Sequence, residues 1–242
     1  MERVPTQVVL RDPERDSEAS GPEEWWVWQW IDSSFPTGGF AHSGGLEAAW
    51  QHGAVRSRDD CRAYLSASLD QAGHAALPWV TAAHRDPRRL LEWDEWCDAF
   101  TSNHVANRAS RAQGRALWAV ALKTFGEERL QPLPHSTAVT LEAAGHYAPR
   151  FGAILGVLGV SARRAQRLFL FGHLRGLLAA AVRLGIVGPM EAQAMQYQLS
   201  QQGESVLDRC AQIEPDDVTQ TQPLHDLWQG AQDRLYSRLF QS

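Results

Sequence analysis

Apolar side chains recur every three or four residues along most of the chain after residue 45, which is the spacing that one buried face of an α-helix produces. Ser57 and Asp60 have the spacing of a capping box, so we expect a helix to begin there. The apolar positions that follow it are Cys61, Tyr64, Leu65 and Leu69. Asp86-Pro87 then places a cap residue before a first-turn proline, which predicts another helix start. The stripe after it consists of Leu90, Trp93, Cys97 and Phe100.

Two long helices are predicted in the second half of the chain. One covers roughly residues 106–125 and ends at Gly126, a residue type that commonly closes helices. Ser161 begins the other, which closes at Gly185. A loop is expected at residues 130–134, and Gly188-Pro189 begins a further helix. Because the alternation that marks strands is nearly absent, we expect an all-α fold, a compact bundle of about eight to ten helices.

The first part of the chain differs in composition from the rest. Residues 1–22 mix charges with Ser, Gly and Pro and contain little to bury, so we expect a flexible N-terminal arm there. Residues 23–242 are expected to form one all-α domain. It begins where four tryptophans arrive together, at Trp25, Trp26, Trp28 and Trp30.

Composition and charge exclude several classes of function. Hydrophobic residues make up 44% and charged residues 21%, and the net charge of −5 gives no support for nucleic-acid or membrane binding. The three cysteines are widely separated, which argues against a disulfide framework or a zinc site. The N-terminus lacks the apolar part of a signal peptide, and the longest apolar run, residues 151–160, is too short to span a membrane. We therefore expect a cytoplasmic protein without cofactor or metal.

The segment between Ala143 and Met190 contains no Asp or Glu. One interpretation is a mostly buried helix with arginines at its edges, and the other is a basic face that meets an acidic partner or a second subunit. The arginines in it are Arg150, Arg163, Arg164, Arg167, Arg175 and Arg183.

The most informative stretch is a Gly-rich run between Ile31 and Trp50. Residues 36–39 are expected to form a tight turn, and residues 43–45 a second one, with Ser43 capping the helix that follows. Glu47 then falls in the first turn of that helix, where the macrodipole favours a carboxylate. We assign a structural role in these turns to Pro36, Gly38, Gly39, His42, Ser43, Gly44, Gly45 and Glu47.

Three chemical alternatives compete for the same stretch. Gly39 and Gly44 have the glycine spacing of a phosphate-binding loop, but the Lys and the Ser/Thr of that loop are missing. The Ser43 region approximates the nucleophile elbow of a hydrolase, although an elbow needs a strand before the serine. Metal binding by His42 lacks a second ligand at a recognisable spacing. All three alternatives are disfavoured by these gaps.

The run from Asp32 to Glu47, DSSFPTGGFAHSGGLE, resembles the signature of the UreF family, D-(S/T)-x-(F/L)-P-x-G-(G/A)-(F/Y)-x-H-S-x-G-(L/M)-E. The resemblance covers roughly residues 24–242. Its weaker parts are an S-x-x-Q-G helix at residues 108–115, His146 with Phe151-Gly152, an R-L-G segment at residues 181–185, and the ending YSRLFQS at residues 236–242. The chain departs from the family pattern at Gly188-Pro189 and at Gln232-Asp233.

This resemblance implies a function. UreF proteins are all-α dimers that bind the accessory protein UreD/UreH and help to recruit the GTPase UreG to the urease apoprotein, where nickel is delivered. By that resemblance the chain is a homodimeric, non-catalytic adaptor of urease maturation. The alternative is a regulator of GTP hydrolysis by UreG that supplies an arginine finger. The candidates for that finger are Arg163, Arg164 and Arg175.

The C-terminal tail is the last candidate site. An apolar stripe runs to the chain end through Leu224, Trp228, Ala231, Leu235 and Leu239. It either closes the protein's own core or binds a partner. The family resemblance favours docking on UreD/UreH, and a tail that can be removed without loss of stability. The partner-binding residues would be Leu235, Tyr236, Arg238, Leu239 and Phe240.

Overall fold

The structure is a computed structural model that describes residues 22–134 and 145–242. The chain divides into two units, Met1–Phe35 and Pro36–Ser242. In the first unit, α1 (Pro22–Ile31) is followed by a turn, and the ring of Phe35 at its end lies 5.2 Å from the ring of Trp30 in α1. Residues 1–21 of the predicted arm lie outside the described part of the chain.

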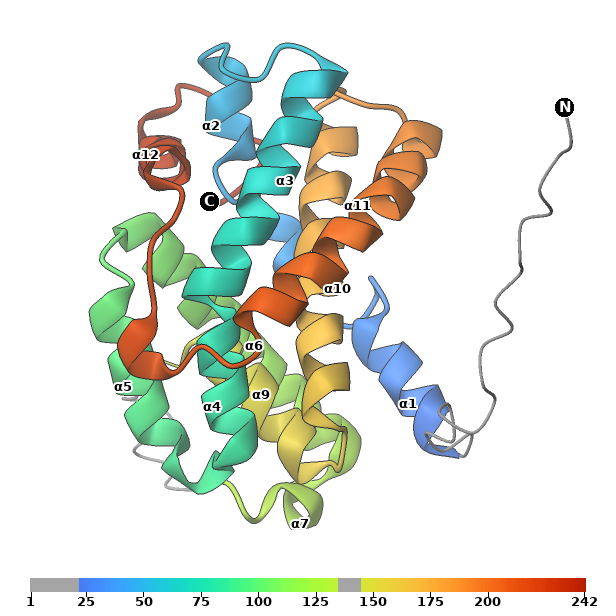
Figure 1. Ribbon diagram of the computed structural model, residues 1–242, viewed down its shortest axis with the longest axis vertical. Coiled ribbons are helices and arrows are strands. Elements are labelled where there is room, and N and C mark those ends of the chain that lie inside the picture. Colours follow the sequence, from blue (N-terminus) through green and yellow to red (C-terminus); the bar gives the residue numbers. More distant parts are fainter. Residues whose placement is uncertain (1–21, 135–144) are drawn as a thin grey trace, which may run out of the picture. The chain divides into compact units, whose positions relative to one another are not determined.

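The second unit is built from helices, and no strand occurs in the described residues, which confirms the all-α prediction (Figure 1). Short 3-10 turns lie at Gly39–Ala41 (η2), Pro87–Arg89 (η3), Pro215–Asp217 (η4) and Gln232–Arg234 (η5). The α-helices are α2 (Leu46–Gln51), α3 (Arg58–Ala75), α4 (Leu77–Arg85), α5 (Leu90–Phe100), α6 (His104–Phe125), α7 (Glu127–Leu130), α9 (Tyr147–Val157), α10 (Ala162–Arg183), α11 (Pro189–Cys210) and α12 (Pro223–Ala231).

Most predicted helix boundaries are confirmed. The Ser57 hydroxyl accepts from the Asp60 N–H at 3.1 Å, and the Asp60 carboxylate accepts from the Ser57 N–H at 3.0 Å, as a capping box requires. Helix α6 ends at Gly126 as predicted, but it begins at His104, because the Asn103 side chain accepts from two N–H groups of the first turn. The loop predicted at residues 130–134 is preceded by one short helical turn, α7.

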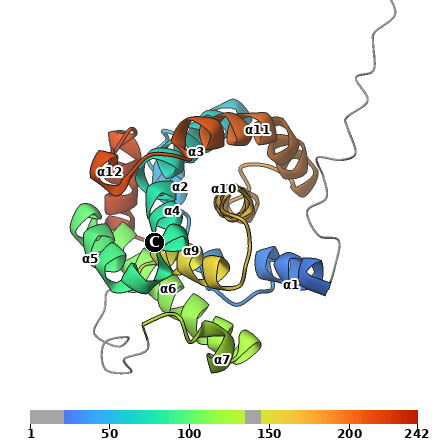
Figure 2. The same cartoon turned by 60° about the horizontal axis from the view of Figure 1, so that its bottom comes forward.

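Helix α10 lies in the middle of the second unit. Figure 2 looks nearly along its axis, with α3, α4, α9 and α11 arranged around it. The buried apolar side chains come from all of these helices, and those of α9 and α10 include Phe151, Ile154, Leu155, Leu174 and Leu178. None of the helices in the described ranges is long and apolar enough to cross a membrane.

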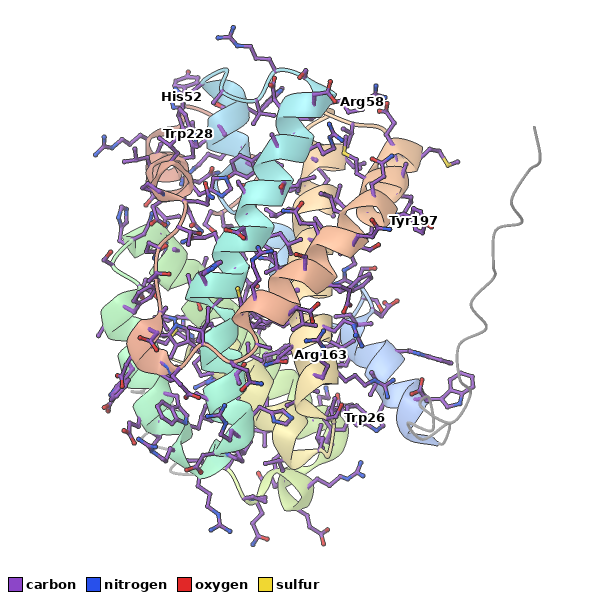
Figure 3. All side chains as sticks on the ribbon, in the orientation of Figure 1. Trp26, His52, Arg58, Arg163, Tyr197 and Trp228 are labelled. Carbon is purple, nitrogen blue, oxygen red and sulfur yellow. The ribbon has the colours of Figure 1, made fainter. Side chains whose placement is uncertain are left out.

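The arginines of the acid-free segment mostly meet groups of the same chain. Arg163, labelled in Figure 3, pairs with Asp208 of α11, and Arg167 pairs with Glu204 of the same helix at 2.6 Å. The guanidinium of Arg150 is buried and donates to the carbonyl oxygen of Gly114. Part of the positive charge of this segment is therefore used in ion pairs with the carboxylates of α11.

Candidate functional site

The Gly-rich segment, residues 36–47, follows two turns before it enters α2. Gly38, Gly44 and Gly45 have φ angles of 75°, 58° and 87°, in the left-handed region that favours glycine. Gly39, the other glycine of the first predicted turn, is the first residue of η2, and its φ is not positive. His42 and Ser43 lie between the two turns, and the backbone of His42 is extended.

The predicted helix cap is wrong. The cap position of α2 is occupied by Gly45, which makes no side-chain bond, and Ser43 lies two residues earlier. The Ser43 hydroxyl is 3.5 Å from the N–H of Glu47, at the outer limit of a hydrogen bond. Its backbone N–H instead donates to the backbone oxygen of Ser242 at 2.5 Å, so Ser43 contacts the chain end.

The backbone of α12 packs directly against Gly45 in the second turn. A Cβ atom at Gly45 would lie 2.8 Å from the backbone nitrogen of Gln229 and 2.9 Å from the hydroxyl oxygen of Tyr64. The Tyr64 hydroxyl donates to the carbonyl oxygen of Gly44 at 2.8 Å. Figure 3 shows a second link between α2 and α12, where the rings of His52 and Trp228 stack 5.8 Å apart. The second turn therefore requires a glycine for space as well as for backbone conformation.

Glu47 is the centre of the contacts with the chain end. Its carboxylate is 1% exposed, and it accepts from the N–H of Leu239 at 2.7 Å and the N–H of Phe240 at 3.1 Å. The side-chain amide of Gln232 adds a third bond at 2.6 Å. A buried carboxylate is tolerated only when such donors replace its water, so Glu47 and these amides depend on each other.

Further bonds extend along the tail, which we define as residues 235–242. The N–H of Gln241 donates to the carbonyl oxygen of Ala41 at 2.8 Å, and His42 Nδ1 lies 2.5 Å from Ser242 Oγ. The guanidinium of Arg183 lies 4.3 Å from the ring centroid of Phe240. The chain end beside α2 in Figure 1 is thus held by the Gly-rich segment. We call the two segments together the tail clasp.

The tail divides into an inner and an outer part. Phe240 is 4% exposed and belongs to the protein's own core, whereas Tyr236 is fully exposed and Leu239 is 58% exposed. Arg238 is also exposed, and Leu235 is half-buried. The predicted stripe is not continuous, because α12 ends at Ala231, the 3-10 turn η5 follows, and the backbone is extended at Leu235. The buried Phe240 and the bonds of Glu47 also contradict the expectation that the tail contributes nothing to stability.

A second cluster joins two of the weaker motifs. Asp94 is buried and accepts from the N–H groups of Gly145 and His146, both at 2.6 Å. His146 is fully buried. Its Nε2 atom lies 2.9 Å from a carboxylate oxygen of Asp98, and its Nδ1 atom lies 3.0 Å from the hydroxyl oxygen of Ser110. We call these residues the α9 node, because they fix the start of α9.

The α9 node has the residue types of a hydrolase triad, but its contacts are those of a structural element. The Ser110 hydroxyl accepts from the N–H of Tyr147 at 3.2 Å, so its own proton is directed at His146. The N–H on the other side of the His146 ring donates to Asp98, and this bond holds the pKa of Asp98 below its usual value. A Cβ atom at Gly114 would lie 2.0 Å from the carbonyl oxygen of Gly145, so the S-x-x-Q-G glycine permits the close approach of α6.

Sequence reasoning missed both carboxylates of the α9 node. Asp94 and Asp98 lie four residues apart beside the apolar stripe of α5, so they share one face of the helix. This spacing of two carboxylates is the sequence pattern that could have indicated the α9 node. In the described residues no cluster of metal-ligating side chains is present. The imidazole of His42 faces Ser242. Burial and the neighbouring Arg108 lower the pKa of His42 below its ordinary value.

The sequence model of the UreF family matches residues 55–200. The urease accessory protein F of Arabidopsis thaliana is 40% identical over 236 residues, which cover 95% of this chain and 98% of the plant protein. The protein of the same name from Oryza sativa subsp. indica is 36% identical, over 89% of this chain and 84% of its own length. The urease accessory protein UreF of Trichodesmium erythraeum is 30% identical, over 88% of this chain and 94% of its own length.

Proposed function

The chain belongs to the UreF family of urease accessory proteins, and we propose that it acts in urease maturation by binding other proteins, without a reaction of its own. The observation that carries this proposal is the tail clasp. The signature at residues 32–47 contains residue types that are found in catalytic loops. In this structure, however, its polar groups form hydrogen bonds with the chain end. An assembly role accounts for that use, and a hydrolytic one does not.

The partner-binding surface that we propose is the outer part of the tail. Glu47 and the buried Phe240 fix the backbone of the tail from inside, and the side chains of Tyr236 and Leu239 are exposed on its outer side. A preformed surface loses less conformational entropy on binding than a free chain end. We propose that this surface binds UreD/UreH, with Arg238 and Leu235 beside it and Phe240 as its internal anchor.

The remaining partners follow from the same proposal. A homodimer bound to UreD/UreH would present a joint surface to which UreG and the urease apoprotein are recruited for nickel insertion, in the cytoplasm. An arginine finger for UreG is less well supported. Arg163 is engaged by Asp208 and Glu204 on a helix face, whereas a finger must stand on an exposed tip.

The test compares the loss of exposed side chains in the tail with the loss of an exposed leucine outside it. Leu239 is 58% exposed in the tail, and Leu224, at 63%, lies in α12 outside it. We expect the double variant Tyr236→Ala/Leu239→Ala to lose capture of UreD/UreH, because burial of each side chain contributes about 1.5–3 kcal/mol and the pair therefore about 10²–10⁴-fold in affinity. Leu224→Ala should bind like the wild type, and all three proteins should melt within a few degrees of each other.

The proposal as a whole is tested in cells that make urease and its accessory proteins but lack their own copy of this chain. The wild-type chain should restore urease activity and co-purify with UreD/UreH and UreG. Its addition should leave single-turnover GTP hydrolysis by UreG unchanged. A wild-type chain that captures neither partner would refute the adaptor role, and acceleration of hydrolysis would favour the regulator.

A further inference from the structure

Arg183 is the last residue of α10, and its guanidinium contacts groups that lie far away in the sequence. Its Nη1 atom donates to the carbonyl oxygen of Phe40 at 2.5 Å, and its Nη2 atom lies 3.5 Å from the carbonyl oxygen of Leu239. Its Cζ atom lies 4.3 Å from the ring centroid of Phe240, within the range of a cation–π contact. Arg167 of the same helix instead pairs with a carboxylate of α11. Arg183 thus joins the end of α10 to both segments of the tail clasp.

Two consecutive carbonyl groups connect the turn η2 to its surroundings. None of the three residues of η2 is buried, and Phe40 is 73% exposed, so burial of side chains does little to hold this turn in place. The carbonyl oxygen of Phe40 accepts from Arg183, and the carbonyl oxygen of Ala41 accepts from the N–H of Gln241 at 2.8 Å. The turn is therefore held between the end of α10 and the tail, and Arg183 supplies the bond on the α10 side.

The backbone of Leu239 is held on both sides of its Cα atom. Its N–H donates to the carboxylate of Glu47 in α2 at 2.7 Å, and its carbonyl oxygen lies 3.5 Å from Nη2 of Arg183 in α10. The second distance is at the outer limit of a hydrogen bond, but the same guanidinium also packs on the ring of the next residue, Phe240. Contacts with two helices therefore set the direction in which the Cα–Cβ bond of Leu239 points, and its side chain is 58% exposed.

We propose that Arg183 is a positioning residue of the partner-binding surface, which holds Leu239 in the orientation that a partner recognises. The inference rests on the proposed function in taking the outer part of the tail as that surface. Arginine suits this role because its planar fork can serve two carbonyl oxygens and stack on a ring at the same time. A lysine keeps the positive charge but has a single ammonium group and no plane. The variant Arg183→Lys therefore separates positioning from simple attraction of an acidic partner.

The experiment measures the affinity of the full-length chain for purified UreD/UreH by biolayer interferometry. The test variants are Arg183→Met and Arg183→Lys. The control is Arg209→Met, which removes an exposed arginine from the last turn of α11, where it pairs with Asp70 of α3. We expect binding to weaken about 10-fold for Arg183→Met and at least about threefold for Arg183→Lys, and to stay within about twofold for the control.

A double-mutant cycle tests whether Arg183 acts through Leu239. In a chain that already carries Leu239→Ala, Arg183→Met should weaken binding by less than about threefold, because the side chain that Arg183 positions is gone. An arginine that contacts the partner directly would instead retain its full effect of about 10-fold in that chain.

Hydrogen exchange of the free protein gives a readout that does not depend on the partner. In Arg183→Met the amides of residues 239–241 should exchange about 10-fold faster than in the wild type, while those of Gly145 and His146 in the α9 node keep their protection. The melting temperature should stay within a few degrees of the wild type, because the side chain of Arg183 is at the surface.

Several results would overturn the inference and leave the adaptor role intact. These are wild-type affinity in Arg183→Met, full affinity in Arg183→Lys, and a full effect of Arg183→Met in the chain with Leu239→Ala. An equal loss of protection in the tail and the α9 node would make Arg183 a general part of the core, and it would overturn the inference as well. A wild-type chain that captures no UreD/UreH would refute the proposed function itself, and the role of Arg183 in binding would fall with it.

Discussion

The tail clasp and the α9 node use the same device at two places in the second unit. In each, one buried carboxylate accepts from two consecutive backbone N–H groups. Glu47 receives those of Leu239 and Phe240, and Asp94 receives those of Gly145 and His146. Both carboxylates are almost completely buried.

The two sites differ in what the carboxylate holds. Asp94 fixes the first turn of α9, which packs against α4, α5, α6 and α10. This turn therefore cannot detach unless the packing of these helices opens. Glu47 fixes a chain end whose outer side chains, Tyr236 and Leu239, face away from the protein. The same interaction therefore serves global stability in one place and the display of a surface in the other.

The largest expected effect is at the α9 node. Asp94→Asn removes the charge that two N–H groups share, and a charge-assisted bond contributes about 1.5–3 kcal/mol, so we expect a loss of about 3–5 kcal/mol in the free energy of unfolding. Urea denaturation followed by circular dichroism measures it. Glu95→Asn, at an exposed position of the same helix, is the control and should change little. A loss below about 1 kcal/mol for Asp94→Asn would remove the distinction between the two sites.

The second effect is at the tail clasp. Glu47→Gln should lower the free energy of unfolding by only about 1.5–3 kcal/mol, because the tail can detach while the core stays folded. Its specific sign is faster amide hydrogen exchange and carboxypeptidase digestion at residues 237–242, together with weaker capture of UreD/UreH. If Glu47→Gln unfolds the whole chain as strongly as Asp94→Asn, the clasp is part of the core and the comparison fails.

The sequence predicts the helices far better than it predicts these two contacts. Capping at Ser57 and Gly126 is local chemistry, so the residue types reveal it, and the structure confirms both. The partners of Glu47 in the C-terminal part of the chain, Gln232 and Leu239 among them, lie more than 180 residues away in sequence, and helical periodicity carries no information about such pairs. Ser43 was misread for the same reason, because its backbone contact with Ser242 leaves no local pattern.

The third prediction separates Ser43 from a true helix cap. Ser57→Ala should cost about 1 kcal/mol, because a bond of 3.1 Å to the Asp60 N–H is lost. Ser43→Ala should cost less than about 0.5 kcal/mol, since its hydroxyl makes only the 3.5 Å contact and its N–H bond to the tail survives. Thermal denaturation of the two variants in parallel gives the ranking. Equal losses would restore the capping role of Ser43.

The smallest expected effect is a dependence of the tail clasp on pH. His42 lies against Ser242, and burial together with the nearby Arg108 lowers its pKa below the value it has in a free chain. A lowered pKa means that the clasped state binds fewer protons than the detached state. The clasp is therefore fully stable above about pH 6.5, the ordinary pKa of histidine, and weakens as the pH falls below it.

Hydrogen exchange of the amides of residues 239–242, corrected for its intrinsic pH dependence, should show lower protection at pH 5.5 than at pH 7.5. His42→Gln should flatten that change, because Gln can bond to the Ser242 hydroxyl but does not titrate. The amides of Gly145 and His146 serve as the internal reference, since they exchange only when the core opens. A parallel loss of protection in tail and node would show that acid destabilises the whole domain, and His42 would then have no specific part in holding the tail.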